Sequence, residues 1–131
     1  MEVLKKVLQE SKENKWPYPK TFEAIKNAGV TSYTVHFEGY YSSTYTGSFG
    51  SYEEKGMEGY QPLTASKSFS QEGLRQAVID HAVKQSHYLD FLKDATDSGA
   101  THYVVDMDKR TVTYYNLDES ASYQEHVPQM A

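Results

Sequence analysis

Residues 29–38 read GVTSYTVHFE, and residues 99–108 read GATHYVVDMD. Each stretch begins with a glycine and then places an apolar or aromatic side chain at every second position, the pattern of a strand with one buried face. A glycine at this point is typical of the left-handed residue that ends a helix. The stretches lie 70 residues apart, so the chain carries the same helix end and the same strand twice.

The same shift of 70 residues aligns further identical positions without a gap. The matched pairs are Leu4 and Leu74, Tyr18 and Tyr88, Gly29 and Gly99, Thr31 and Thr101, Tyr33 and Tyr103, Val35 and Val105, and Tyr45 and Tyr115. Chance matching in a chain rich in Tyr and Thr is the competing explanation. Because the periodicities repeat along with the identities, we favour a fold built from two copies of one unit.

Each copy predicts two helices and then a hairpin. In the first copy, residues 2–14 and about 20–28 have helical apolar spacing, and residues 30–38 and 40–46 have strand character. The prolines after Trp16 separate the two helices, because a proline moves the residue before it away from helical geometry.

In the second copy, Ser70 is a helix N-cap, and a second helix covers about residues 87–98. Strands are expected at 101–107 and 110–117. Since one such unit is too small to bury its own apolar face, the two hairpins are expected to join in one sheet.

These elements predict an α+β fold in which two α-α-β-β repeats form one four-stranded antiparallel sheet with the helices packed on one face. Residues 1–131 are expected to form a single domain. Its repeat units span about 1–47 and 69–117, a polar loop covers 47–68, and a tail covers 118–131.

Composition narrows the functional classes. The chain of 131 residues carries a net charge of −5, whereas a duplex nucleic-acid binder normally has a basic stripe, so no nucleic-acid partner is expected. There is no cysteine, which excludes disulfides, thiolate metal sites and a cysteine nucleophile. The charged N-terminus does not resemble a signal peptide, and no apolar run is long enough to span a bilayer. We therefore expect a cytoplasmic protein without a membrane partner.

Weak candidates for acid–base chemistry are His36, His81, His102 and Asp106. The strand alternation places His36, His102 and Asp106 on the sheet face away from the helices, where imidazoles beside a carboxylate can transfer protons. A polar, solvated sheet face explains the same residues, and His81 also fits a partly buried histidine with a local hydrogen bond. Since no closely spaced ligand set or phosphate-binding loop occurs, no metal and no cofactor are expected.

The strongest binding signal is the Tyr, Ser and Gly content of residues 40–60, because these residue types also dominate antibody binding loops. The candidate binding residues are Tyr40, Tyr41, Tyr45, Tyr52 and Tyr60. An aromatic hairpin that packs on its neighbour through cross-strand pairs is the alternative. The partner would be another protein or a second copy of the chain, since an uncovered sheet face suits a two-fold dimer.

Several segments resemble a known family: His81, residues 88–91, 98–100, 103–106, 111–115 and 127–128, together with Pro19, Phe22, residues 28–30 and Tyr33. These segments are similar to the YdfO-like family, small uncharacterised bacterial proteins that are often prophage-borne and are sometimes labelled "phage envelope protein". The resemblance implies an α+β fold and brings no established activity. Val112 stands where the family carries a cysteine, so thiol chemistry is not expected here.

Together these observations predict a small cytoplasmic, non-catalytic interaction or accessory module of bacterial or prophage origin. The alternative is a ligand-binding protein or an acid–base enzyme that uses the His and Asp residues of the open sheet face.

Overall fold

A computed structural model describes residues 2–56, 59–84 and 88–127. The elements in chain order are α1 (Glu2–Asn14), α2 (Tyr18–Asn27), β1 (Val30–His36), β2 (Ser42–Gly47), β3 (Gly50–Lys55), α3 (Gln71–Lys84), α4 (Tyr88–Asp97), β4 (His102–Asp106), β5 (Thr111–Tyr115) and β6 (Ser122–His126).

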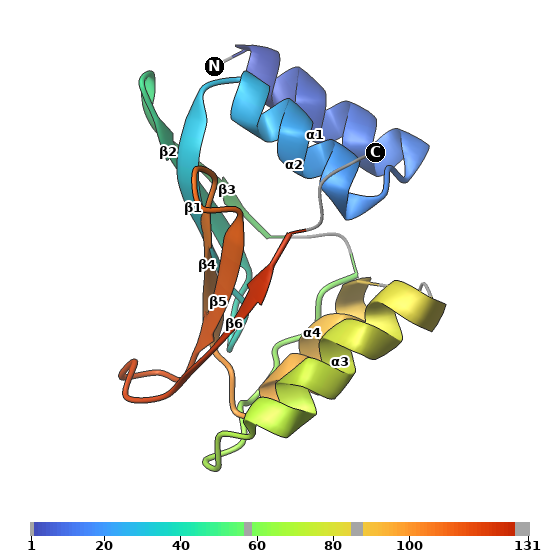
Figure 1. Cartoon of the computed structure of the whole chain (residues 1–131), viewed down its shortest axis with the longest axis vertical. Helices are drawn as coiled ribbons and strands as arrows, with labels where there is room; N and C mark the ends of the chain where they lie inside the picture. Colours follow the sequence, from blue (N-terminus) through green and yellow to red (C-terminus); the bar gives the residue numbers. More distant parts are fainter. Residues whose placement is uncertain (1, 57–58, 85–87, 128–131) are drawn as a thin grey trace.

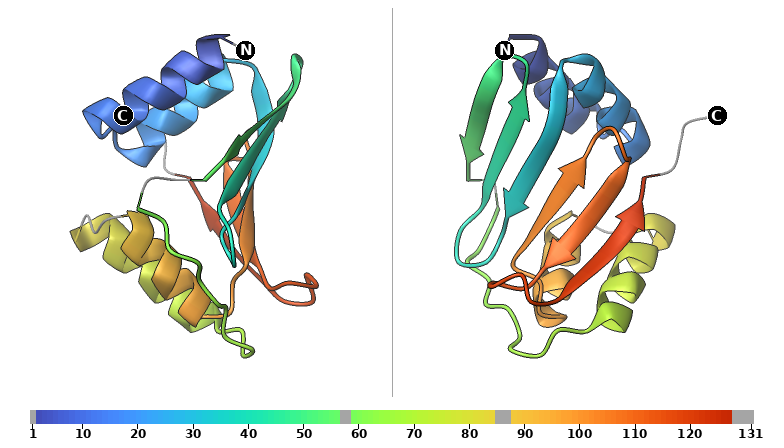
Figure 2. Two further views of the ribbon diagram at one scale, coloured as in Figure 1. Left: turned by 180° about the vertical axis from the view of Figure 1, so that it is seen from behind. Right: turned by 60° about the vertical axis from the view of Figure 1, so that its left-hand side comes forward.

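The strands form one antiparallel sheet in the order β3-β2-β1-β4-β5-β6. All the helices that the structure describes pack on the same face of this sheet, with α1 and α2 near one end and α3 and α4 near the other (Figure 1). The opposite face is left uncovered, as the right-hand view of Figure 2 shows. The predicted α+β class, the antiparallel sheet and the one-sided helices are therefore confirmed.

The predicted four-stranded sheet is wrong, because the sheet has six strands. The additional strands are β3, which lies inside the predicted loop 47–68, and β6, which lies inside the predicted tail 118–131. Each repeat is thus α-α-β-β-β. Both strands lie at sheet edges and are short and mostly polar, as edge strands generally are, so their hydrophobic signal is too weak to separate them from loops.

An approximate two-fold axis passes between the neighbouring strands β1 and β4. Tyr33 pairs with Val105, and Val35 pairs with Tyr103, so the partners exchange roles between the two units. Residues 30–46 and 100–116 thus belong to one sheet, as the repeat requires.

One repeat match needs correction. Tyr33 pairs with Tyr45 across β1 and β2, whereas Tyr103 pairs with Tyr114 across β4 and β5. The counterpart of Tyr45 is therefore Tyr114 and not Tyr115. The reason is the length of the connections: residues 37–41 join β1 to β2, whereas residues 107–110, one residue fewer, join β4 to β5.

The predicted helix ends hold in both units. Gly29 and Gly99 follow α2 and α4 with φ angles of +100° and +95°, a conformation that glycine adopts without the strain of a side chain. Ser70 caps α3, since its Oγ accepts the backbone N–H of Gly73 at 2.9 Å. The helix α2 begins at Tyr18, earlier than predicted, because proline is compatible with the first turn of a helix.

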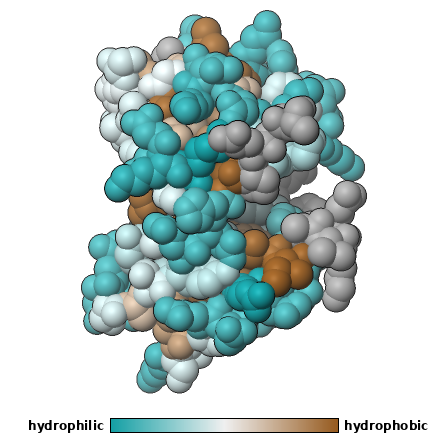
Figure 3. All heavy atoms as spheres, in the orientation of Figure 1, coloured by the Kyte–Doolittle hydropathy of each residue, from teal (hydrophilic) through white to brown (hydrophobic). Residues whose placement is uncertain are grey.

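The core lies between the sheet and the helices. Fully buried side chains come from α1, α2, α3 and α4 and from β1 and β4, and they include Leu4, Phe22, Ile25, Leu74, Leu92, Val35 and Val105. Hydrophilic residues cover most of the molecular face seen in Figure 3, and hydrophobic residues gather there only in smaller areas.

Candidate functional site

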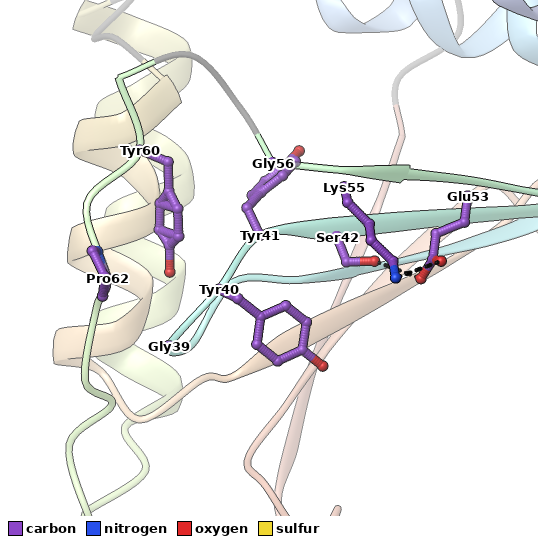
Figure 4. A pocket seen from close by; sticks show the side chains of 9 residues that line it. All are labelled: Gly39, Tyr40, Tyr41, Ser42, Glu53, Lys55, Gly56, Tyr60 and Pro62. Carbon is purple, nitrogen blue, oxygen red and sulfur yellow. Dashed lines mark hydrogen bonds and ion pairs between the residues drawn. The ribbon is translucent and has the colours of Figure 1, made fainter.

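A hollow of about 620 Å³ opens beside the β1–β2 connection and the end of β3 (Figure 4). Tyr60 and Pro62 form one side, on the segment that leads towards α3, and the other lining residues come from the β1–β2 connection, β2 and the end of β3. The lining residues are Gly39, Tyr40, Tyr41, Ser42, Glu53, Lys55, Gly56, Tyr60 and Pro62. The hollow is open to solvent, so a bound ligand would keep part of its surface exposed.

Two of the lining rings are held in place by hydrogen bonds between their hydroxyl groups and the protein. The hydroxyl of Tyr60 donates to the backbone carbonyl of Phe37 at 2.5 Å and accepts the N–H of Leu63 at 3.4 Å. The hydroxyl of Tyr41 accepts a hydrogen bond from Ser43 Oγ at 3.5 Å, and its ring meets that of Tyr60 edge-on at 6.0 Å. Because these hydroxyls are already engaged with the protein, the two residues offer mainly aromatic surface to a ligand.

The third ring, Tyr40, is exposed but held in place. It keeps 60% of its surface accessible, yet it stacks on His36 with ring centroids 4.5 Å apart and planes at 18°. The preceding Gly39 has a φ of +76° and donates its N–H to the Leu63 carbonyl at 2.8 Å, which ties the connection to the opposite side of the hollow. Tyr40 is thus an aromatic platform with one face already occupied.

The polar wall of the hollow is close to neutral. Ser42, which is 7% exposed, donates to Glu53 Oε2 at 3.0 Å, and Lys55 Nζ lies 3.8 Å from Glu53 Oε1 (Figure 4). A ligand in the hollow would meet a carboxylate, an ammonium and a hydroxyl that are already arranged around one another.

The histidines His36 and His102 lie side by side on the uncovered face. Their rings stack at 6.1 Å, and His102 stacks in turn on Tyr115 at 5.4 Å. We call Tyr40, His36, His102 and Tyr115 the ring row. Burial, followed by the nearby His102, lowers the pKa of His36 and thereby favours its neutral form.

The nitrogens of His102 both have partners inside the protein. Its Nδ1 lies 2.8 Å from Thr101 Oγ1, and its Nε2 lies 2.8 Å from Glu119 Oε2. These bonds occupy the atoms that would transfer a proton or hold a metal.

The other two acid–base candidates lie elsewhere. Asp106 is at the far end of β4 from His102, and its Oδ1 accepts the backbone N–H of Lys109 in the following turn. His81 is on α3 and stacks on Phe91 of α4 at 5.1 Å. The structure thus brings together His36 and His102, places Asp106 and His81 apart from them, and gives none of the four a place among the residues that line the hollow.

The remaining predicted tyrosines belong to a symmetric arrangement on the covered face. Tyr52, Tyr45 and Tyr33 are cross-strand neighbours in the first unit, and Tyr123, Tyr114 and Tyr103 are their counterparts in the second. We call these two sets the tyrosine rows. Tyr45 is only 6% exposed, so it lies in the core and outside the hollow.

Each tyrosine row is joined to a helix through a pair of hydroxyls. Tyr18, at the start of α2, hydrogen-bonds to Tyr33, and Tyr88, at the start of α4, hydrogen-bonds to Tyr103 at 2.7 Å. Burial raises the pKa of Tyr18 to about 12 and raises the pKa values of Tyr33, Tyr88 and Tyr103 well above the usual value. The hydroxyl of Tyr18 is buried against Tyr33, although 39% of the surface of the whole residue is accessible.

The raised pKa values predict loss of stability in alkali. Unfolded tyrosines ionise near pH 10, whereas burial raises the pKa values of Tyr33, Tyr88 and Tyr103 in the folded protein, so the free energy of unfolding should fall as the pH rises above 10. Phenolate absorbance should therefore show the exposed tyrosines titrating first and the buried ones only as the fold is lost. Titration of all 12 tyrosines near pH 10 in the folded protein would contradict this arrangement.

The sequence pattern does not indicate the polar residues of the hollow, because it predicts a loop where the structure has β3. Residues 51–54 read SYEE and residues 122–125 read SYQE, so the third strand of each unit carries the same Ser-Tyr-x-Glu pattern. The shift between them is 71 residues, whereas β1 and β4 are related by a shift of 70 and β2 and β5 by a shift of 69, so an alignment without gaps passes over the pattern. This pattern is the signal that would have revealed both edge strands and, with them, Glu53.

Within residues 2–56, 59–84 and 88–127, no group of three or more His, Cys, Asp or Glu side chains could hold a metal ion. No helix in the same ranges is long and apolar enough to cross a membrane.

Fold and site together define a duplicated α+β protein with a one-sided sheet and an aromatic hollow at one edge. The chain belongs to the family described as "Protein of unknown function (DUF1398)", whose model matches residues 5–126.

Similar curated proteins are the uncharacterised proteins Mb2035 of Mycobacterium bovis and MT2067 and Rv2012 of Mycobacterium tuberculosis. Each is 27% identical over 109 residues, which covers 83% of this chain. The chain matches 65% of the length of each relative, so it spans somewhat less than two thirds of them.

Proposed function

We propose that this protein is a non-catalytic binding module and that the hollow lined by Tyr40, Tyr41 and Tyr60 is its binding site. The observation that carries the proposal is that three predicted binding tyrosines line one concavity at the edge of the sheet together with Ser42 and Glu53. Tyr41 and Tyr60 lie on its helix side, and Tyr40 lies with Ser42 and Glu53 on its uncovered side. Concave sites with aromatic walls and a few fixed polar groups are the usual form of a ligand site.

The comparison of the two repeats supports this location. The hollow borders the β1–β2 connection, where the first unit departs from the second by an additional residue. At the corresponding turn of the second unit, Arg110 forms an ion pair with Glu23 and lies over the ring of Phe22 at 4.6 Å. The β4–β5 connection is thus attached to α2 through Arg110. The β1–β2 connection is attached instead to the segment before α3, through the hydrogen bond from Gly39 to Leu63, and a concavity remains beside it.

The geometry of the acid–base candidates favours binding over catalysis. An acid–base site needs its groups within reach of one substrate atom. His102 has both nitrogens engaged within the protein, and Asp106 is bonded to its own turn. The enzyme alternative therefore has less support than the binding module.

Further parts of the proposal rest on the sequence. They are a bacterial or prophage origin with membership of the YdfO-like group, a cytoplasmic location, and a protein partner or second copy that docks on the uncovered face. The resemblance supports the first, composition supports the second, and the uncovered face of the sheet supports the third.

A fragment screen followed by NMR tests the site. The backbone amides of Gly39 and Gly56, which are hydrogen-bonded to Leu63 and Tyr41, report on opposite parts of the lining. We expect fragments that bind to shift these amides, and we expect Tyr40→Ala to weaken their binding about tenfold, since it removes the exposed platform. Tyr115→Ala, at the other end of the ring row, is the matched control and should bind as the parent does. Hits that cluster away from the hollow would refute the proposal.

A further inference from the structure

The lining of the hollow selects against several classes of ligand. Lys55 is the cation among the lining residues, and it lies 3.8 Å from the carboxylate of Glu53. Phosphate groups are normally held by several cationic or backbone donors, and this hollow does not supply them. Binding of a nucleotide or another phosphorylated compound is therefore disfavoured.

A cationic ligand is disfavoured for the complementary reason. Glu53, the carboxylate of the lining, already receives the hydroxyl of Ser42 at 3.0 Å and the ammonium of Lys55. A bound cation would compete with Lys55 for the same oxygens. A wholly apolar ligand would bury these polar groups without replacing their contacts with water, which costs free energy.

Beside the neutral polar wall the hollow offers the aromatic surface of Tyr40, whereas Tyr41 and Tyr60 lie on the helix side of the sheet edge. Tyr41 and Tyr60 have their hydroxyls tied inward, and Tyr40 has one face stacked on His36 and 60% of its surface exposed. These rings lose little freedom on binding because the protein already orders them. Glu53 can accept hydrogen bonds from a ligand, and Lys55 can donate them.

From this lining we infer that the hollow takes a neutral saccharide, an inference that rests on the proposed binding function. A sugar ring has an apolar C–H face that can pack on the exposed face of Tyr40, and it has hydroxyl groups that both donate and accept. The hydroxyls pair with Glu53 and Lys55 without requiring net charge in the site, while Ser42 holds the carboxylate in position.

The test is NMR titration of the full chain with defined probes. The saccharides are cellobiose, maltose, lactose and N,N′-diacetylchitobiose, and the competing classes are represented by adenosine, adenosine monophosphate and choline. We expect at least one disaccharide to shift the amides of Gly39 and Gly56, whereas the competing probes should leave them unchanged.

Two variants and a control assign the contacts. Tyr40→Ala and Glu53→Gln should each weaken the disaccharide at least tenfold, about 1.4 kcal/mol. Tyr115→Ala should bind the disaccharide as the parent does, because Tyr115 belongs to the ring row but not to the lining. The amide spectrum of each variant shows whether the fold is intact.

The failures of the two proposals are distinguishable. If adenosine, its monophosphate or choline shifts the hollow amides and the disaccharides do not, the saccharide inference is wrong and the binding function stands. If fragments shift these amides and no disaccharide does, the saccharide inference is again wrong and the binding function again stands. If neither fragments nor probes perturb the hollow, both proposals fall.

Discussion

Gly99→Ala is expected to lower the free energy of unfolding by about 3 kcal/mol, the sum of a conformational and a steric cost. Gly99 has a φ of +95°, which L side chains rarely adopt. An added Cβ would also lie 2.7 Å from the backbone oxygen of Ser68 and 2.8 Å from Cα of Phe69, so backbone would have to move. The backbone of Ser68 and Phe69 cannot move away easily, because the N–H of the next residue, Ser70, donates to the Ser98 carbonyl at 2.8 Å.

The matched control for this substitution is Gly50→Ala at the first residue of β3. Gly50 has a φ of +104°, but nothing lies within 4 Å of an added Cβ, so only the conformational cost of about 1–2 kcal/mol remains. Urea unfolding of both variants gives the two free energies. Equal losses would show that the close approach of Ser68 and Phe69 to Gly99 has no energetic weight.

Phe22→Ala and Leu92→Ala should each destabilise the whole protein, by about 3–5 and 2–5 kcal/mol respectively. Both side chains are fully buried, and they occupy equivalent positions in α2 and α4, one turn after Tyr18 and Tyr88. Because the two units share one sheet through β1 and β4, neither can lose its core while the other keeps a complete apolar cover. We therefore expect one cooperative transition in both variants.

The measurement is urea unfolding followed by far-ultraviolet circular dichroism and by tyrosine signals, which should coincide. Val3→Ala on α1, where the side chain is 62% exposed, is the control and should change stability by less than about 0.5 kcal/mol. Separate transitions, with one unit unfolding before the other, would refute the prediction that residues 1–131 form a single domain.

The inner part of the fold was predictable because its signals are local. The alternation after Gly29 and Gly99 reflects strands with one face against helices and one face towards solvent, and it gave the correct faces for Tyr33 and Tyr103. The glycines themselves mark helix ends where a positive φ is needed. Such features depend on a few neighbouring residues, so a single sequence reveals them.

The edge strands and the site were less accessible to sequence reasoning. In β3, Tyr52 faces the covered side while its polar neighbours face solvent, so the stretch has little apolar pattern, and its counterpart in β6 aligns only after a change of shift. The hollow combines Tyr40, Ser42, Glu53 and Tyr60 from four successive parts of the chain. Their proximity depends on the pairing of β2 with β3 and on the return of the chain past Phe37, which no local pattern encodes.

The amino-acid sequence by itself determined the duplication, the helices, the inner strands and the aromatic character of residues 40–60, because spacing and residue type act over a few positions. The tertiary structure alone decided which tyrosines are core and which line a concavity. Tyr45 and Tyr40 are similar in sequence context, but Tyr45 faces the helices from β2, whereas Tyr40 lies in a connection and stacks on His36 with its outer face exposed. The side of the sheet on which a ring falls is set by strand register, and register is fixed only when the strands pair.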